Sequence, residues 1–76
     1  MARYNGHRSW NAWNVALWIG NDEGLYHEAR RCLRRKNATE AARMFLSEVV
    51  QEGDKTPDGA VWNFKCVREA LANLGA

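Results

Sequence analysis

Residues 9–21 constrain the fold more than any other part of the chain. Spaced at 100° per residue, their apolar side chains cover more than half the circumference of a helix. The apolar residues on this arc are Ala12, Trp13, Val15, Ala16, Leu17, Ile19 and Gly20. Ser9 is a favourable N-cap for this helix. An arc this wide must be covered by neighbouring elements, so we expect the helix to be central, with Trp13 and Leu17 among the most buried residues.

Three further helices are predicted from capping residues and apolar spacing. Asp22 is the expected N-cap of the second helix. Asn37 and Glu40 have the spacing of a capping box for the third, which we expect to end at Gly53. The fourth helix should begin after Asn63. Strand-like alternation is absent, so the sequence predicts an all-α fold, a compact bundle of three to four short helices.

Size and composition indicate one globular domain over residues 1–76. Hydrophobic residues make up 46% of the 76 positions, and four of them are Trp, which is enough for a small core. The longest apolar run, residues 15–19, is far too short to span a membrane. Residues 1–6 lack the apolar stretch of a secretory signal. We therefore expect a cytoplasmic protein without a membrane partner.

No catalytic or cofactor motif is present in the sequence. His7 and His27 have no motif spacing to each other or to a Ser or Cys, and the six glycines form no phosphate-binding loop. Cys32 and Cys66 form no CxxC pair and no zinc-ligand set. We expect no enzyme, no cofactor and no metal site. Cys66 lies at the edge of an apolar face, and its predicted partial exposure indicates a monomer or a weak homodimer.

The most basic part of the chain is residues 30–36. Five of the eleven Lys and Arg residues fall there with no acid among them, although the formal net charge of the whole chain is only +2. These residues are Arg30, Arg31, Arg34, Arg35 and Lys36. Arginine forks match both carboxylates and phosphates, so the Arg30–Lys36 face is a candidate site for an acidic protein or for nucleic acid.

Two other interpretations of these cations remain open. They would also complement the dipole at the end of a helix, and could form a solvated face without a partner. A helix-turn-helix would bring the same segment to DNA, although the connection that follows lacks the glycine often found in that turn.

A second unusual group lies on the first helix. Asn11, Asn14 and Asn21 share one narrow stripe, the asparagine stripe, with Trp18 beside it, and Asn is a poor helix former. Of these residues, Asn11, Asn14 and Trp18 are candidates for a partner-binding surface. The alternative is internal: residues 4–7 or Trp62 would cover the stripe, with the amides capping loop backbone.

Several motifs resemble a family of very small proteins of bacteriophages, prophages and other mobile elements. The matching stretches are Tyr-Asn-Gly at residues 4–6, the segments 9–19 and 21–26, the turn at 55–59, and Asn63. Residues 10–12 differ from the Tyr-Glu-Thr that family members carry before the Trp.

This resemblance implies a phage-borne gene expressed in the bacterial cytoplasm and no enzymatic activity. Many such proteins bind and block host defence machinery, including CRISPR effectors. We therefore expect a steric inhibitor of a host protein or nucleoprotein complex, similar to an anti-CRISPR protein. The alternative is a small nucleic-acid-binding or regulatory protein that uses the Arg30–Lys36 face.

Overall fold

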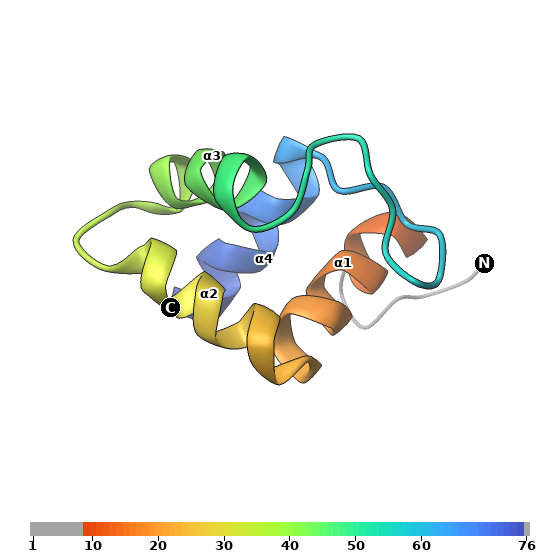
Figure 1. Cartoon of the computed structure of the whole chain (residues 1–76), viewed down its shortest axis with the longest axis horizontal. Coiled ribbons are helices and arrows are strands. Elements are labelled where there is room, and N and C mark those ends of the chain that lie inside the picture. The colour runs from red at the N-terminus through yellow and green to blue at the C-terminus, as the bar shows by residue number, and fades with distance from the viewer. Residues whose placement is uncertain (1–8, 76) are drawn as a thin grey trace.

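A computed structural model of the chain describes residues 9–75, and four helices account for most of them. The helices are α1 (Trp10–Asn21), α2 (Glu23–Leu33), α3 (Ala38–Glu48) and α4 (Phe64–Gly75) (Figure 1). Within residues 9–75 the only β pairing is an isolated antiparallel bridge between Lys55 and Val61. The predicted all-α bundle is confirmed.

Each helix begins at the residue that the sequence predicts. The side-chain oxygens of Ser9, Asp22, Asn37 and Asn63 each accept a hydrogen bond from the backbone N–H three residues further on. At Asn37 the capping box is complete, because the backbone N–H of Asn37 also donates to the Glu40 side chain. Short polar residues therefore fix the start of every helix by satisfying N–H groups that have no partner inside the helix.

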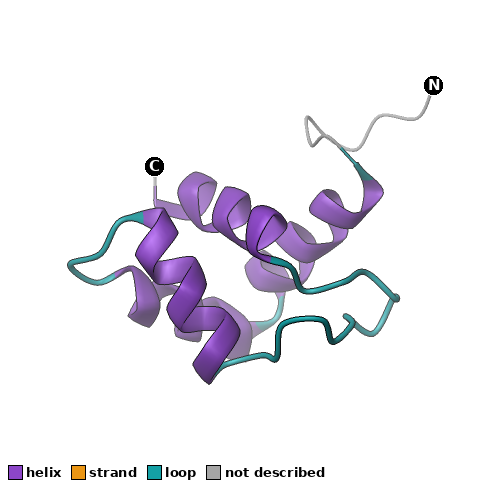
Figure 2. Ribbon diagram, turned by 90° about the horizontal axis from the view of Figure 1, so that it is seen from above, coloured by secondary structure: helices purple, strands orange, loops and turns teal. Residues whose placement is uncertain are grey.

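Helix α4 has the largest interfaces, with α3 and with α1, and it also touches α2, so α4 is the central helix and the prediction that α1 is central is wrong. The largest fully buried apolar side chains come from α1, α3 and α4: Val15, Ile19, Phe45, Val67 and Leu71. The ring of Phe45 also packs against Trp62, with the two ring centres 6.0 Å apart. Figures 1 and 2 show that the short α2–α3 connection and the long α3–α4 connection lie at opposite ends of the molecule.

The burial predicted for α1 is wrong in one respect. Trp13 and Leu17 are only half-buried, whereas Val15 and Ile19 are fully buried. The reason is that Asn14 is also buried, so the covered arc of α1 runs from Val15 and Ile19 through the asparagine stripe. Trp13 and Leu17 fall outside that arc, on the other side of the helix.

The predicted end of the third helix at Gly53 is also wrong. Helix α3 ends at Glu48, and Val49 caps it by donating its backbone N–H to the carbonyl oxygen of Phe45. Gly53 lies in the long connection, where its φ of 94° suits glycine, and its N–H donates to the carbonyl oxygen of Trp62 at 2.9 Å. Gly53 therefore closes the base of the long connection instead of ending the helix.

Candidate functional site

The asparagine stripe of α1 binds the long connection between α3 and α4. The Asn11 amide pairs with the backbone of Val61 in both directions: Nδ2 donates to the carbonyl oxygen at 2.9 Å, and Oδ1 accepts from the N–H at 2.7 Å. Asn11 Nδ2 also lies 3.3 Å from Cys66 Sγ. One side chain thus supplies the two hydrogen bonds that a neighbouring strand would give to Val61.

Asn14 and Trp18 hold the turn at residues 56–59 in the same connection. Asn14 Oδ1 accepts from the Thr56 hydroxyl at 2.6 Å, and Asn14 Nδ2 donates to Asp58 Oδ2 at 2.9 Å. Trp18 Nε1 donates to the same carboxylate oxygen at 3.0 Å. These two hydrogen bonds lower the pKa of Asp58, because they stabilise its charged form. The turn itself is closed by the N–H of Gly59, which donates to the carbonyl oxygen of Thr56 at 2.8 Å.

We call these contacts, made by Asn11, Asn14 and Trp18 to residues 56–61, the asparagine clamp. Asn14 is 1% exposed and its amide is used internally, so it offers no surface to a partner, and the partner-binding role predicted for it is corrected. The contacts are internal, as the alternative predicts, but they are made by residues 56–61 and not by Trp62, and residues 4–7 lie outside the described residues. Trp18 keeps part of its ring exposed and lines a small pocket with Leu17, Asn21 and Asp22.

The clamp also bears on the burial of Cys66, for which the sequence wrongly predicts partial exposure. Cys66 is only 7% exposed, and the Asn11 amide lies against its sulfur. Both cysteines are free thiols. Burial raises the pKa of Cys32, which makes its thiol a weak nucleophile. A homodimer linked through an accessible Cys66 is therefore not supported by this geometry.

The basic residues gather where α2 turns into α3. Arg34, with φ −62° and ψ 120°, and Arg35, with φ 57°, occupy the two central positions of a type II turn. The turn is closed by the N–H of Lys36, which donates to the carbonyl oxygen of Leu33 at 3.2 Å. The second central position requires a positive φ and usually holds glycine. Arg35 is the only residue other than glycine with a positive φ among those described.

Arg31 differs from the other four cations. Its guanidinium pairs with Glu28 at 2.8 Å and with Glu48 of α3 at 3.4 Å, and the hydrogen bond to Glu28 raises its pKa. Arg31, a candidate for partner binding in the sequence, therefore joins α2 to α3 within the molecule. The periodicity of α2 alone could not reveal Glu48, which lies on another helix.

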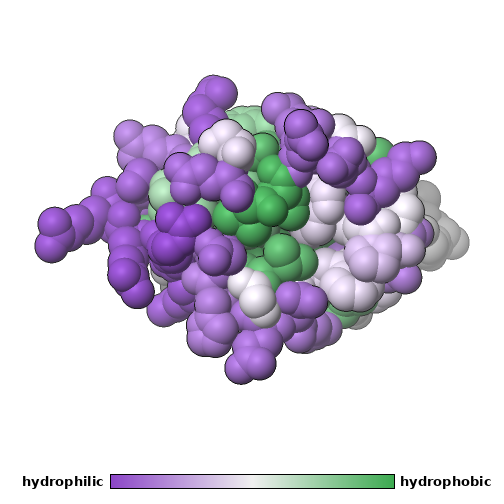
Figure 3. Space-filling view, viewed as in Figure 1, coloured by the Kyte–Doolittle hydropathy of each residue, from purple (hydrophilic) through white to green (hydrophobic). Residues whose placement is uncertain are grey.

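The remaining four cations form what we call the basic end: Arg30, Arg34, Arg35 and Lys36. All four are exposed. Arg30 lies over the Tyr26 ring, 6.0 Å from its centre, and Nη1 is 3.4 Å from the carbonyl oxygen of Leu74. Arg34, Arg35 and Lys36 form no ion pair with any residue between 9 and 75. Figure 3 shows hydrophilic side chains projecting from this end of the molecule, whereas a hydrophobic patch lies in the middle of the same face.

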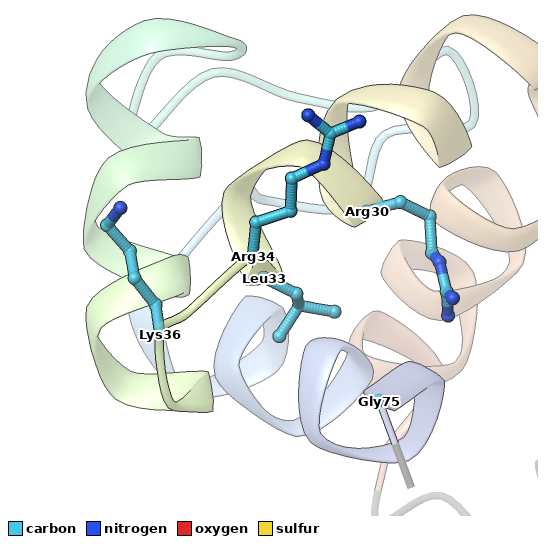
Figure 4. A pocket seen from close by; sticks show the side chains of 5 residues that line it. All are labelled: Arg30, Leu33, Arg34, Lys36 and Gly75. Atoms are coloured by element: carbon cyan, nitrogen blue, oxygen red, sulfur yellow. The ribbon is translucent and has the colours of Figure 1, made fainter.

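A shallow pocket of about 290 Å³ lies within the basic end. It is lined by Arg30, Leu33, Arg34, Lys36 and Gly75 (Figure 4). The sequence alone did not predict the roles of Leu33 and Gly75, because Leu33 belongs to the core stripe of its helix and Gly75 comes from the far end of α4. The fold brings these two residues together, and the pocket forms beside them.

The described residues hold no group of three or more His, Cys, Asp or Glu side chains that could bind a metal ion. No helix among residues 9–75 has the length and apolar character needed to cross a membrane.

Comparison with known proteins gives one match, at the level of the family. No curated protein and no solved structure matches the chain. The model of a family of unknown function, DUF7249, matches residues 1–74, which is nearly the whole chain. The chain therefore belongs to the DUF7249 family.

Proposed function

We propose that this chain is a non-enzymatic protein that inhibits a bacterial host-defence complex, with the basic end as its docking surface. The inhibition is steric: the bound chain occludes the site at which the complex recruits nucleic acid, as an anti-CRISPR protein would. The observation that supports this proposal is the contrast between neighbouring cations of the segment 30–36. Arg31 is paired with two carboxylates of its own molecule, whereas Arg34, Arg35 and Lys36 have no acidic partner among residues 9–75.

The strained turn adds to this support. A left-handed conformation costs an L-residue about 1 kcal/mol or more, and glycine avoids that cost. Arg35 nevertheless occupies this position, where its side chain is exposed and forms no ion pair with any of residues 9–75. A strained residue with no role in holding the fold is a candidate for binding.

The second candidate function is phosphate binding on nucleic acid by the same cations. It is favoured by the number of unpaired guanidinium groups, since arginine contacts phosphate as readily as carboxylate. The two functions differ in their response to salt. Phosphate binding predicts retention of random DNA or RNA that falls steeply as salt rises, because each neutralised phosphate releases a counterion.

The test is a pull-down from a bacterial host that carries a CRISPR system, together with an assay of plasmid interference in the same host. The wild-type chain should capture a defence nucleoprotein complex and restore plasmid uptake. The Arg34→Glu/Arg35→Glu variant should fold normally and lose both effects. Lys65→Glu/Arg68→Glu is the matched control, because it changes the net charge equally at two exposed positions in the first half of α4.

Two results would contradict the proposal. One is a wild-type chain that captures no defence component. The other is an Arg34→Glu/Arg35→Glu variant that inhibits as well as the wild type while remaining helical by circular dichroism. Tight retention of random nucleic acid with a steep salt dependence would favour the second candidate function instead.

A further inference from the structure

The pocket of the basic end has an apolar floor. Leu33 is partly buried, and its side chain lies beside the last turn of α4 (Figure 4). A Cβ atom built on Gly75 would lie 3.7 Å from both methyl carbons of Leu33, so the missing side chain at Gly75 leaves the space beside Leu33 open. A volume of about 290 Å³ is at the lower limit for a small-molecule site, but it accommodates one side chain of a partner.

The cations around this floor do not converge on a single point. In Figure 4, Arg30, Arg34 and Lys36 extend from the pocket in different directions, with Leu33 between them. The guanidinium of Arg30 is also held toward the Tyr26 ring and the carbonyl oxygen of Leu74. A site built for one phosphate would direct its donors at one anion. Divergent cations instead suit several separate carboxylates spread over a surface.

An apolar centre with a charged rim is the usual anatomy of a protein–protein contact. Sites for single-stranded nucleic acid usually add aromatic side chains on which bases stack. None of the described residues that line this pocket is aromatic. The chemistry of the pocket therefore favours an acidic protein over a nucleic acid.

We propose that the pocket receives one aliphatic side chain from an acidic segment of a partner protein. The aliphatic side chain lies on Leu33 and Gly75, and carboxylates on either side of it pair with Arg30, Arg34 and Lys36. This inference rests on the proposed function, because it specifies the partner chemistry of the same docking surface. It adds to the proposed function that the partner is recognised by an aliphatic side chain as well as by its negative charge.

The test uses a display library of 12-residue peptides, in which two blocks of glutamate flank a randomised centre. The wild-type chain, the Gly75→Leu variant and the Gly20→Leu variant are each used to select from it. Leucine at position 75 fills the pocket without changing any charge. It also favours the helix over glycine. Gly20→Leu is the matched control, since Gly20 is also helical and a Cβ atom built on it would have no neighbour within 4 Å.

We expect the wild-type chain and Gly20→Leu to enrich Leu, Ile or Met over Ser at the centre by about tenfold, the effect of burying one aliphatic side chain. Gly75→Leu should lose this preference and still retain acidic peptides. The inference would be overturned, and the proposed function left untouched, if Gly75→Leu enriched aliphatic residues as strongly as the wild type, or if the wild type showed no such enrichment. A second library with serine in place of the glutamate blocks tests the proposed function separately. The proposed docking on an acidic protein fails if the wild-type chain retains the serine library as well as the acidic library. It also fails if a single-stranded oligonucleotide displaces all acidic peptides from the wild-type chain.

Discussion

The asparagine clamp lies on helix α1, and the basic end lies at the turn between α2 and α3. Both are clusters of polar side chains, but their polar groups are used in opposite ways. In the clamp, Asn11 and Asn14 use their amide groups on residues 56–61 of the same molecule. At the basic end, Arg34 and Arg35 have no acidic partner among residues 9–75. An unusual cluster of polar residues thus has two explanations, and the number of its groups that lack a partner within the molecule separates them.

The comparison predicts that the clamp contributes mainly to stability and the basic end mainly to binding. A substitution in the clamp should therefore change the free energy of unfolding. A substitution at the basic end should leave that free energy nearly unchanged and alter affinity. Three experiments test this division, from the largest expected effect to the smallest.

Asn14→Ala should destabilise the fold by about 3 kcal/mol, because it leaves the buried Thr56 hydroxyl without its acceptor and removes a donor from Asp58. Urea unfolding followed by circular dichroism measures this loss. Asn21→Ala is the control, since Asn21 is exposed on the same helix and its loss should cost less than about 0.5 kcal/mol. A loss below about 1 kcal/mol for Asn14→Ala would show that the clamp does not hold the connection.

Acid should weaken the clamp through Asp58. The folded-state pKa of Asp58 lies below its ordinary value of 3.8, so its stabilising effect is complete above pH 3.8 and is lost as pH falls through the folded pKa. The effect should be smaller than that of Asn14→Ala because Asp58 is exposed. Urea unfolding of wild type and Asp58→Asn should differ at pH 7 and converge at low pH. A difference that persists unchanged at pH 2 would contradict this assignment.

Arg35→Gly should stabilise the fold by about 1 kcal/mol, since it relieves the left-handed conformation, and should weaken partner binding because one cation is lost. Arg34→Gly is the matched control. It removes the same charge at a φ of −62°, so it should not stabilise the fold. Thermal unfolding and the capture assay measure the two effects. If Arg35→Gly gains stability and binds as well as wild type, Arg35 has no part in docking.

Local features of the fold were predictable from the sequence. The caps at Ser9, Asp22, Asn37 and Asn63 depend on residues at most three positions apart, and each is confirmed. The apolar stripes of the helices depend on similarly short spacings. These interactions leave their pattern within a few residues of sequence, which is why a helical bundle could be inferred.

Contacts between distant segments were harder to predict. Three of these contacts depend on how the helices pack. They are the ion pair of Arg31 with Glu48 on α3, the contact of Asn11 with Cys66, and the proximity of Leu33 to Gly75. The asparagine stripe of α1 is unusual in the sequence alone, but the sequence could not decide between a partner and a loop as its cover. The wide apolar arc of α1 likewise did not show which of its sides would be covered, and the prediction for Trp13 is wrong for that reason.

The separation in sequence between the two halves of the clamp has a consequence for how the chain folds as it is synthesised. Asn11 is added 50 residues before Val61, and the two meet only when the long connection has been made. Helix α1 must also wait for α4, which packs against it and comes last. Until then α2 is the only one of the other three helices that α1 can pack against, so part of its apolar arc has no cover, and such exposed surface favours aggregation. Of the four helices, the first to be synthesised is therefore among the last to reach its native surroundings.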